Sequence, residues 1–150
     1  MEKSTKEYND LKIKMENSFK NLNYHFEFVD FDDGDLNYFV RIILTKKMRF
    51  NCLLYAEIKK ASISLLSFNI YSFDKNESLD PFYKIMNDIN SIISHGKFII
   101  SENMREIQYL STINFKENFS DFTDNKIEIL VEDYKNNLKK LLWLLSNREK

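Results

Sequence analysis

The chain has few of the residues that cross-link or interrupt a polypeptide, with one cysteine, one proline and two glycines among 150 residues. The single cysteine, Cys52, excludes an internal disulfide, and a chain without a disulfide framework is more typical of the cytosol than of secretion. Two isolated glycines cannot form a glycine-rich loop of the kind that binds phosphate through several backbone amides. No linker rich in proline, glycine or serine divides the sequence, so residues 1–150 are predicted to form a single domain.

Long hydrophobic runs are missing as well. The longest contain only a few residues, whereas a helix that crosses a bilayer needs roughly 20, and no apolar core typical of a cleaved signal peptide follows Met1. The formal net charge is −1, which gives no electrostatic reason to expect nucleic acid or an acidic membrane as a partner. These features predict a cytoplasmic protein. The abundance of lysine, asparagine and isoleucine is typical of AT-rich genomes and predicts a bacterial origin, chromosomal or phage.

Apolar residues are plentiful, and their spacing predicts the secondary structure. They make up 43% of the chain, which is enough to build a core. Helical spacing is found in three segments, at residues 5–21, from Asp80-Pro81 to Gly96, and from Asn125 to the C-terminal end. Pro81 suits the first turn of its helix, and Gly96 suits the left-handed position that ends a helix.

Between these helices the apolar period changes to two, which is typical of strands with one buried face. Six segments show this alternation, and short turns join most of them into consecutive antiparallel pairs. The segments begin near Tyr24, Leu36, Phe50, Ser62, Lys97 and Glu106. The predicted order is α-β-β-β-β-α-β-β-α, an α+β fold in which three helices cover one face of an antiparallel sheet of five to six strands.

The patterns that carry catalysis or bind metal are missing. His25 and His95 stand alone and Cys52 has no neighbouring thiol, so the clustered ligands of a metal site are lacking. The acidic segment Asp30–Asp35 does not have the alternate spacing of a calcium loop, and Arg41 stands where the bidentate glutamate would be required. No catalytic, metal-binding or cofactor-binding residue is therefore predicted, and the chain is expected not to be an enzyme. A catalytic role would need an unrecognised site around Cys52 or His95.

An excess of apolar residues on the second face of the sheet is the feature that points to function. If one face packs on the helices, the alternate residues point to the other face, where an open sheet normally carries polar residues. Together with the apolar end of the last helix, these residues form the predicted protein-contact surface: Phe39, Ile43, Leu53, Tyr55, Leu110 and Trp143. Three alternatives stay open: the last helix packs on the second face, the exposures are scattered, or a small apolar ligand lies between the last helix and the sheet.

The second predicted helix and the segments after it resemble a known family. The helix reads Phe82 and then Ile85-Met86-Asn87-Asp88-Ile89-Asn90, and it runs into Gly96-Lys97-Phe98. A strand pair that turns at Glu102–Arg105 and a closing amphipathic helix follow. This arrangement resembles the YbjN-domain family, whose fold is similar to that of type III secretion chaperones. The resemblance implies a non-enzymatic regulator on a fold that elsewhere dimerises and holds partly unfolded clients, and it brings no catalytic residues with it.

The combined prediction is a non-catalytic protein-binding module, a YbjN-like regulator or chaperone-like protein. Its expected partner is another protein, a second copy of the chain as a homodimer, or both. The alternative is a small inhibitor or immunity-type protein, phage- or plasmid-borne, that blocks an enzyme through the acidic hairpin Asp30–Asp35 or the basic turns at Lys46-Lys47 and Lys59-Lys60. The basic turns lack interleaved aromatic residues, so nucleic acid is not favoured as a partner, and no membrane partner is expected.

Overall fold

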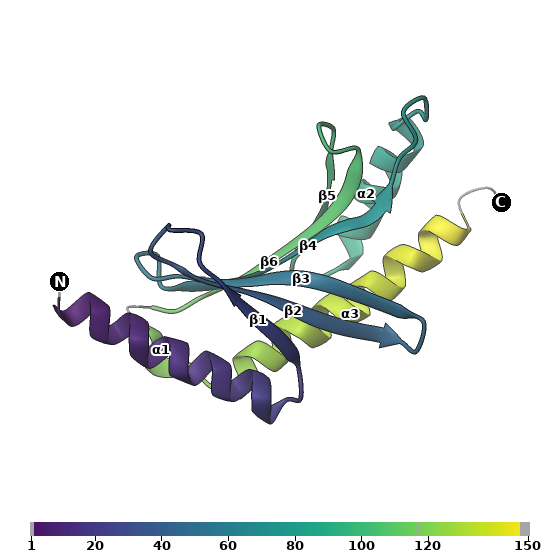
Figure 1. Cartoon of the computed structure of the whole chain (residues 1–150). Helices are drawn as coiled ribbons and strands as arrows, with labels where there is room; N and C mark the ends of the chain where they lie inside the picture. The colour runs from purple at the N-terminus through teal and green to yellow at the C-terminus, as the bar shows by residue number, and fades with distance from the viewer. Residues whose placement is uncertain (1, 117, 148–150) are drawn as a thin grey trace.

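The computed structural model describes residues 2–116 and 118–147, and Figure 1 shows its helices and strands. The elements are α1 (Glu2–Asn21), β1 (His25–Val29), β2 (Leu36–Thr45), β3 (Met48–Glu57), β4 (Ser62–Ser72), α2 (Asp80–Ile92), β5 (Lys97–Ser101), β6 (Glu106–Asn114), the 3₁₀ turn η1 (Phe119–Asp121) and α3 (Asp124–Ser146). The predicted α+β fold class and order of elements are therefore confirmed. None of the described helices is long and apolar enough to cross a membrane.

All six strands belong to one antiparallel sheet, in the order β1-β2-β3-β4-β6-β5. Strands β1 to β4 form a meander, and the hairpin of β5 and β6 returns so that β6 pairs with β4 and β5 lies at the edge. The register shifts at two places, between Ile43 and Thr45 in β2 and between Ser67 and Tyr71 in β4. Asn69 has a φ of 53° inside the second irregularity, and such bulges bend and twist a strand.

The helices lie on one side of the sheet, so that one of its faces is covered. Helix α1 packs on β1, α3 packs on β4 and β6, and α2 packs on β5 (Figure 1). Phe19 of α1 is fully buried, with its ring centroid 5.1 Å from those of Phe26 and Tyr38. Burying an aromatic side chain of this size contributes about 1.5–3 kcal/mol. The strand residues under the helices are buried: Leu36, Tyr38, Val40, Ile42, Cys52, Leu54, Ala56, Ile63, Leu65, Ile107 and Tyr109.

Helix α2 ends earlier than predicted. It ends at Ile92, and Gly96, predicted as the residue that ends the helix, lies in the connection to β5 with a φ of 77°. A Cβ at position 96 would overlap the hydroxyl group of Tyr109. Asn137 of α3 donates from Nδ2 to that hydroxyl at 3.2 Å and to the carbonyl oxygen of His95 at 2.9 Å. Glycine is therefore required at this position by a contact between distant elements.

Candidate functional site

The face of the sheet opposite the helices is uncovered, because none of the described helices lies over it (Figure 1). We call this surface the open sheet face. Side chains alternate along a strand, so the open sheet face consists of the residues that lie between the buried ones. A sheet face in contact with water normally carries polar side chains. Here it carries apolar side chains on four neighbouring strands.

Four of these apolar residues lie in register across the sheet. Phe39 on β2 pairs with Leu53 on β3, Leu53 pairs with Leu66 on β4, and Leu66 pairs with Leu110 on β6. They form a continuous line perpendicular to the strands, which we call the central apolar row. Neighbouring strands are about 4.8 Å apart, so the row is roughly 14 Å long. Phe39 is 38% exposed, and the three leucines are partly exposed.

Charged residues of opposite sign lie at the two ends of the central apolar row. Glu27 on the edge strand β1 pairs with Phe39, and Lys97 on the edge strand β5 pairs with Leu110. Both side chains are exposed, and neither belongs to the ion pairs formed within the described part of the chain. The four apolar residues are therefore flanked by an acid on β1 and a base on β5, and Arg41 of β2 lines the same hollow as Glu27 and Phe39.

A second row, of more polar residues, runs beside the first. It consists of Asn37, Tyr55, Ser64 and Thr112, which are also paired in register. The hydroxyl groups of Ser64 and Thr112 are hydrogen-bonded at 2.7 Å, and Asn37 donates from Nδ2 to the carboxylate oxygens of Asp33 at 3.2 Å. Because these polar groups find partners within the chain, Tyr55 is the side chain of this row that is available to a partner.

The structure places five of the six predicted contact residues on the open sheet face: Phe39, Ile43, Leu53, Tyr55 and Leu110. Sequence reasoning missed Leu66, although the alternation along β4 contains it. It also missed Phe31 in the β1–β2 turn, whose ring meets that of Phe39 edge-on with centroids 6.5 Å apart. That this face binds a protein stays a prediction.

Trp143, the sixth predicted contact residue, lies elsewhere. It is on α3 and is 64% exposed, and it shares a groove with Leu144 and with Ile92 of α2. The alternative in which the last helix packs on the second face is wrong, because α3 packs on the side that α1 and α2 also occupy (Figure 1). Tyr134, Leu138 and Leu141, all 0% exposed, fill the space between α3 and the sheet, which is where the alternative of a small apolar ligand would place it.

Cys52 lies on the covered face, as a buried structural thiol. It is 0% exposed, next to the hydrogen bond of 2.7 Å between the hydroxyl groups of Ser67 and Tyr134. Burial raises the pKa of the Cys52 thiol to about 11, although contacts with Ser67 and Tyr134 act in the opposite direction. A thiol with such a pKa is protonated at neutral pH and is a poor nucleophile.

The acidic hairpin uses its carboxylates to hold its own backbone. Asp30 accepts a hydrogen bond from the backbone N–H of Asp32 at 2.8 Å, and Asp33 accepts one from that of Asp35 at 2.9 Å. Such bonds are typical of Asx turns. Within residues 2–116 and 118–147, no group of three or more His, Cys, Asp or Glu side chains could hold a metal ion.

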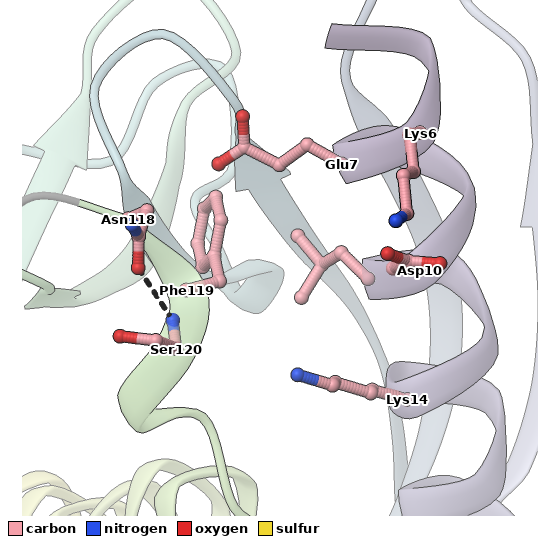
Figure 2. Close-up of a pocket in the computed structure, with 8 residues that line it drawn as sticks. Lys6, Glu7, Asp10, Lys14, Asn118, Phe119 and Ser120 are labelled. Atoms are coloured by element: carbon pink, nitrogen blue, oxygen red, sulfur yellow. Dashed lines mark hydrogen bonds between the residues drawn. The ribbon is translucent and has the colours of Figure 1, made fainter. Parts of the chain in front are cut away.

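A cleft between α1 and η1 brings several polar side chains together (Figure 2). Lys6, Glu7, Asp10 and Lys14 of α1 face Phe119 across it, and the side chain of Asn118 accepts a hydrogen bond from the backbone N–H of Ser120 at 2.8 Å. The two lysines and two carboxylates balance in charge. The side chains that line the cleft in the described structure include no histidine or cysteine.

The chain has a distant likeness to a solved structure. No protein-family model and no curated protein matches it. It is similar to a chain of the HopA1-SchA chaperone-effector complex, with 13% sequence identity and a TM-score of 0.49 over 93% of this chain and 94% of that chain. A likeness at this level carries no argument about function. Membership of the YbjN-domain family stays a prediction.

Proposed function

We propose that the protein is a non-catalytic binding domain that recognises another protein through the open sheet face. The observation that carries the proposal is the central apolar row, four apolar side chains in register on a face that no described helix covers. Contiguous apolar surface on a water-exposed domain marks interaction sites. A cytoplasmic regulator or chaperone-like protein, the role predicted from the sequence, would hold an apolar segment of its partner on such a surface.

Recognition is expected on the face of the sheet rather than at its β5 edge. A partner strand that joins a sheet edge needs free N–H and C=O groups. At β5, the backbone N–H and C=O of Phe98 are both hydrogen-bonded to the side chain of Asn90. No helix or strand among the described residues covers the central apolar row, so its side chains are open to a partner.

The alternative, an inhibitor that acts through the acidic hairpin, has weaker support. Asp33 and Asp35 already accept hydrogen bonds from the backbone, Asp35 from the N–H of Ile58 at 3.1 Å. Lys59 and Lys60 line the same cleft as these aspartates. The hairpin therefore presents mixed charge, whereas an inhibitor that relies on electrostatic attraction needs a surface of one sign.

The test is native mass spectrometry of the tagged protein purified gently from its own host. Wild type is expected to carry a second polypeptide. Leu53→Asp, in the middle of the central apolar row, should lose it because the carboxylate would have to be desolvated in the contact. Ile13→Asp is the matched control, since Ile13 is 62% exposed on α1 and lies outside the open sheet face.

Two further measurements, the salt dependence of the complex and its response to the two substitutions, separate the candidate functions. A complex formed through apolar contacts should survive high salt, whereas one held by the charged hairpin should dissociate. The proposal fails if Leu53→Asp retains the complex while circular dichroism shows a native fold, or if Ile13→Asp loses the complex to the same extent. A partner that is retained by Leu53→Asp and released by salt would support the inhibitor instead.

A further inference from the structure

The central apolar row and its charged ends have a pattern that is complementary to itself. In the sheet order β1-β2-β3-β4-β6-β5, the central apolar row and the residues that flank it are an acid, four apolar residues and a base. The residues in this order are Glu27, Phe39, Leu53, Leu66, Leu110 and Lys97. A two-fold interface brings the same patch of two copies together, so it requires a surface that matches itself after rotation. The row meets this requirement because reversing its direction only exchanges the acid and the base.

The rotation can be specified. A two-fold axis that runs along the strands, between β3 and β4, places Leu53 of one copy against Leu66 of the second copy. It also places Phe39 against Leu110 of the second copy, so the two central apolar rows cover each other. The same rotation places Glu27 against Lys97 of the second copy, and it does so twice in the dimer. Opposite charges at a rim fix the orientation of an interface more than its strength.

The second row fits the same axis independently. The rotation places Tyr55 of one copy against Ser64 of the second copy, the bulkiest side chain of this row against the smallest. Ser64 is 1% exposed, so it does not project into the space that Tyr55 would enter. Asn37 falls against Thr112, which pairs polar with polar. Interdigitation of large and small side chains is how two sheets pack face to face.

Shape and size agree with this arrangement. Two copies of a twisted sheet related by an axis along their strands have parallel surfaces, as in the aligned packing of β-sandwiches. Six strands that are about 4.8 Å apart and roughly eight residues long cover on the order of 700 Å². Stable interfaces of standard size bury about 600–1,000 Å² of each partner. The open sheet face is therefore large enough for a dimer.

We propose that two copies of this chain close face to face over the open sheet face, with the acidic end of each central apolar row on the basic end of the other. The inference rests on the proposed function, since it names the occupant of the same face before a partner protein arrives. Self-pairing then regulates recognition, because a partner must displace the second copy.

The test is analytical ultracentrifugation of the full chain with charge-reversed variants. Wild type is expected to dimerise. Glu27→Lys and Lys97→Glu each replace two attractive contacts by two repulsive ones, so each should weaken the dimer about 10-fold at low salt and less at high salt. The variant with both substitutions should recover the wild-type dissociation constant, and so should an equimolar mixture of the two single variants. Controls outside the face are Glu128→Lys on α3 and Lys14→Glu on α1, both exposed, which should have no effect.

Leu53→Asp is a second test of the open sheet face and should abolish the dimer. Thermal unfolding of this variant should still show a native fold. The inference is overturned if wild type is monomeric, if the single charge reversals dimerise like wild type, or if the doubly reversed variant does not recover. A monomeric wild type whose partner complex is lost in Leu53→Asp would remove self-pairing alone. A dimer that follows the charge exchange, together with a partner complex insensitive to Leu53→Asp, would remove the proposed recognition of a partner alone.

Discussion

Asn90 of α2 pairs with Phe98 of β5 as a neighbouring strand would. Its Nδ2 donates to the carbonyl oxygen of Phe98 and its Oδ1 accepts from the backbone N–H of Phe98, both at 2.8 Å. One side chain thereby satisfies the two backbone groups of an edge residue, which a partner strand would otherwise use at this position.

Replacing Asn90 should destabilise the fold and leave the outward backbone groups of Phe98 without their side-chain partner. Asn90→Ala leaves the N–H and C=O of Phe98 to water or unpaired, and we expect a loss of about 1–3 kcal/mol in the free energy of unfolding. Denaturation in urea measures it. Asn87→Ala is the control, because Asn87 is an exposed residue on the same helix. Equal effects of the two substitutions would contradict the role given to Asn90.

The two glycines provide a matched pair of substitutions. Gly34 and Gly96 have φ values of 80° and 77°, but a Cβ meets nothing within 4 Å at Gly34 and overlaps Tyr109 at Gly96. Gly34→Ala should cost only the strain of the left-handed backbone, about 1–2 kcal/mol. Gly96→Ala should cost about 1–3 kcal/mol more, since it adds a steric clash. Thermal or chemical unfolding compares them, and a similar loss for both would show that the contact with Tyr109 yields easily.

Cys52 should be inert towards thiol reagents in the folded protein. Its thiol is fully buried and its pKa is raised to about 11 by that burial, so neither access nor ionisation favours reaction. We expect labelling by a maleimide only at the rate of unfolding, and complete labelling in denaturant. Ser94→Cys, at an exposed position, is the control for a reactive thiol. Fast labelling of Cys52 in native conditions would reopen the question of a catalytic thiol.

Asp124 should make the stability of the fold depend on acidity. Its carboxylate joins the start of α3 to α1, through hydrogen bonds from Ser18 and from Asn21 (3.1 Å), and these bonds lower the pKa of Asp124. A carboxyl group with a lowered pKa in the folded state stabilises the fold above its unfolded pKa, near 4, and this contribution disappears as the pH falls through the folded pKa.

The change that tests this is Asp124→Asn. The difference in Tm between wild type and this variant should be greatest near neutral pH and should shrink below about pH 4. Circular dichroism during heating measures it across a pH series, with Asp10→Asn, an exposed residue, as the control. A Tm difference that does not change with pH would mean that the ionised carboxylate does not contribute.

The elements and the covered face could be predicted from the sequence because both follow from local periodicity. Phe39 and Leu53 were expected on the open sheet face for the same reason, since each alternates with buried neighbours. The central apolar row itself could not be predicted. It depends on the insertion of β6 between β4 and β5, which aligns Leu66 with Leu110 and which no local pattern specifies.

Two other residues show why local patterns mislead. Gly96 is a glycine shortly after a helical pattern, as expected of a residue that ends a helix, yet its role is to leave room for Tyr109 of β6. Trp143 belongs to an apolar stripe wide enough to serve two surfaces, and only the packing of α3 on β4 and β6 decides that it lies away from the open sheet face. In both cases a contact between distant elements determines the outcome.

The most direct test of the central claim is photo-cross-linking from the open sheet face. The reactive amino acid p-benzoylphenylalanine would replace Phe39, 38% exposed in the central apolar row, or Tyr83, 39% exposed on α2, as an exposure-matched control. Irradiation in host cells should link position 39, and not position 83, to another polypeptide, either a partner protein or a second copy of the chain. Cross-links of equal yield at both positions, or none at position 39, would contradict the claim that the open sheet face is the binding surface.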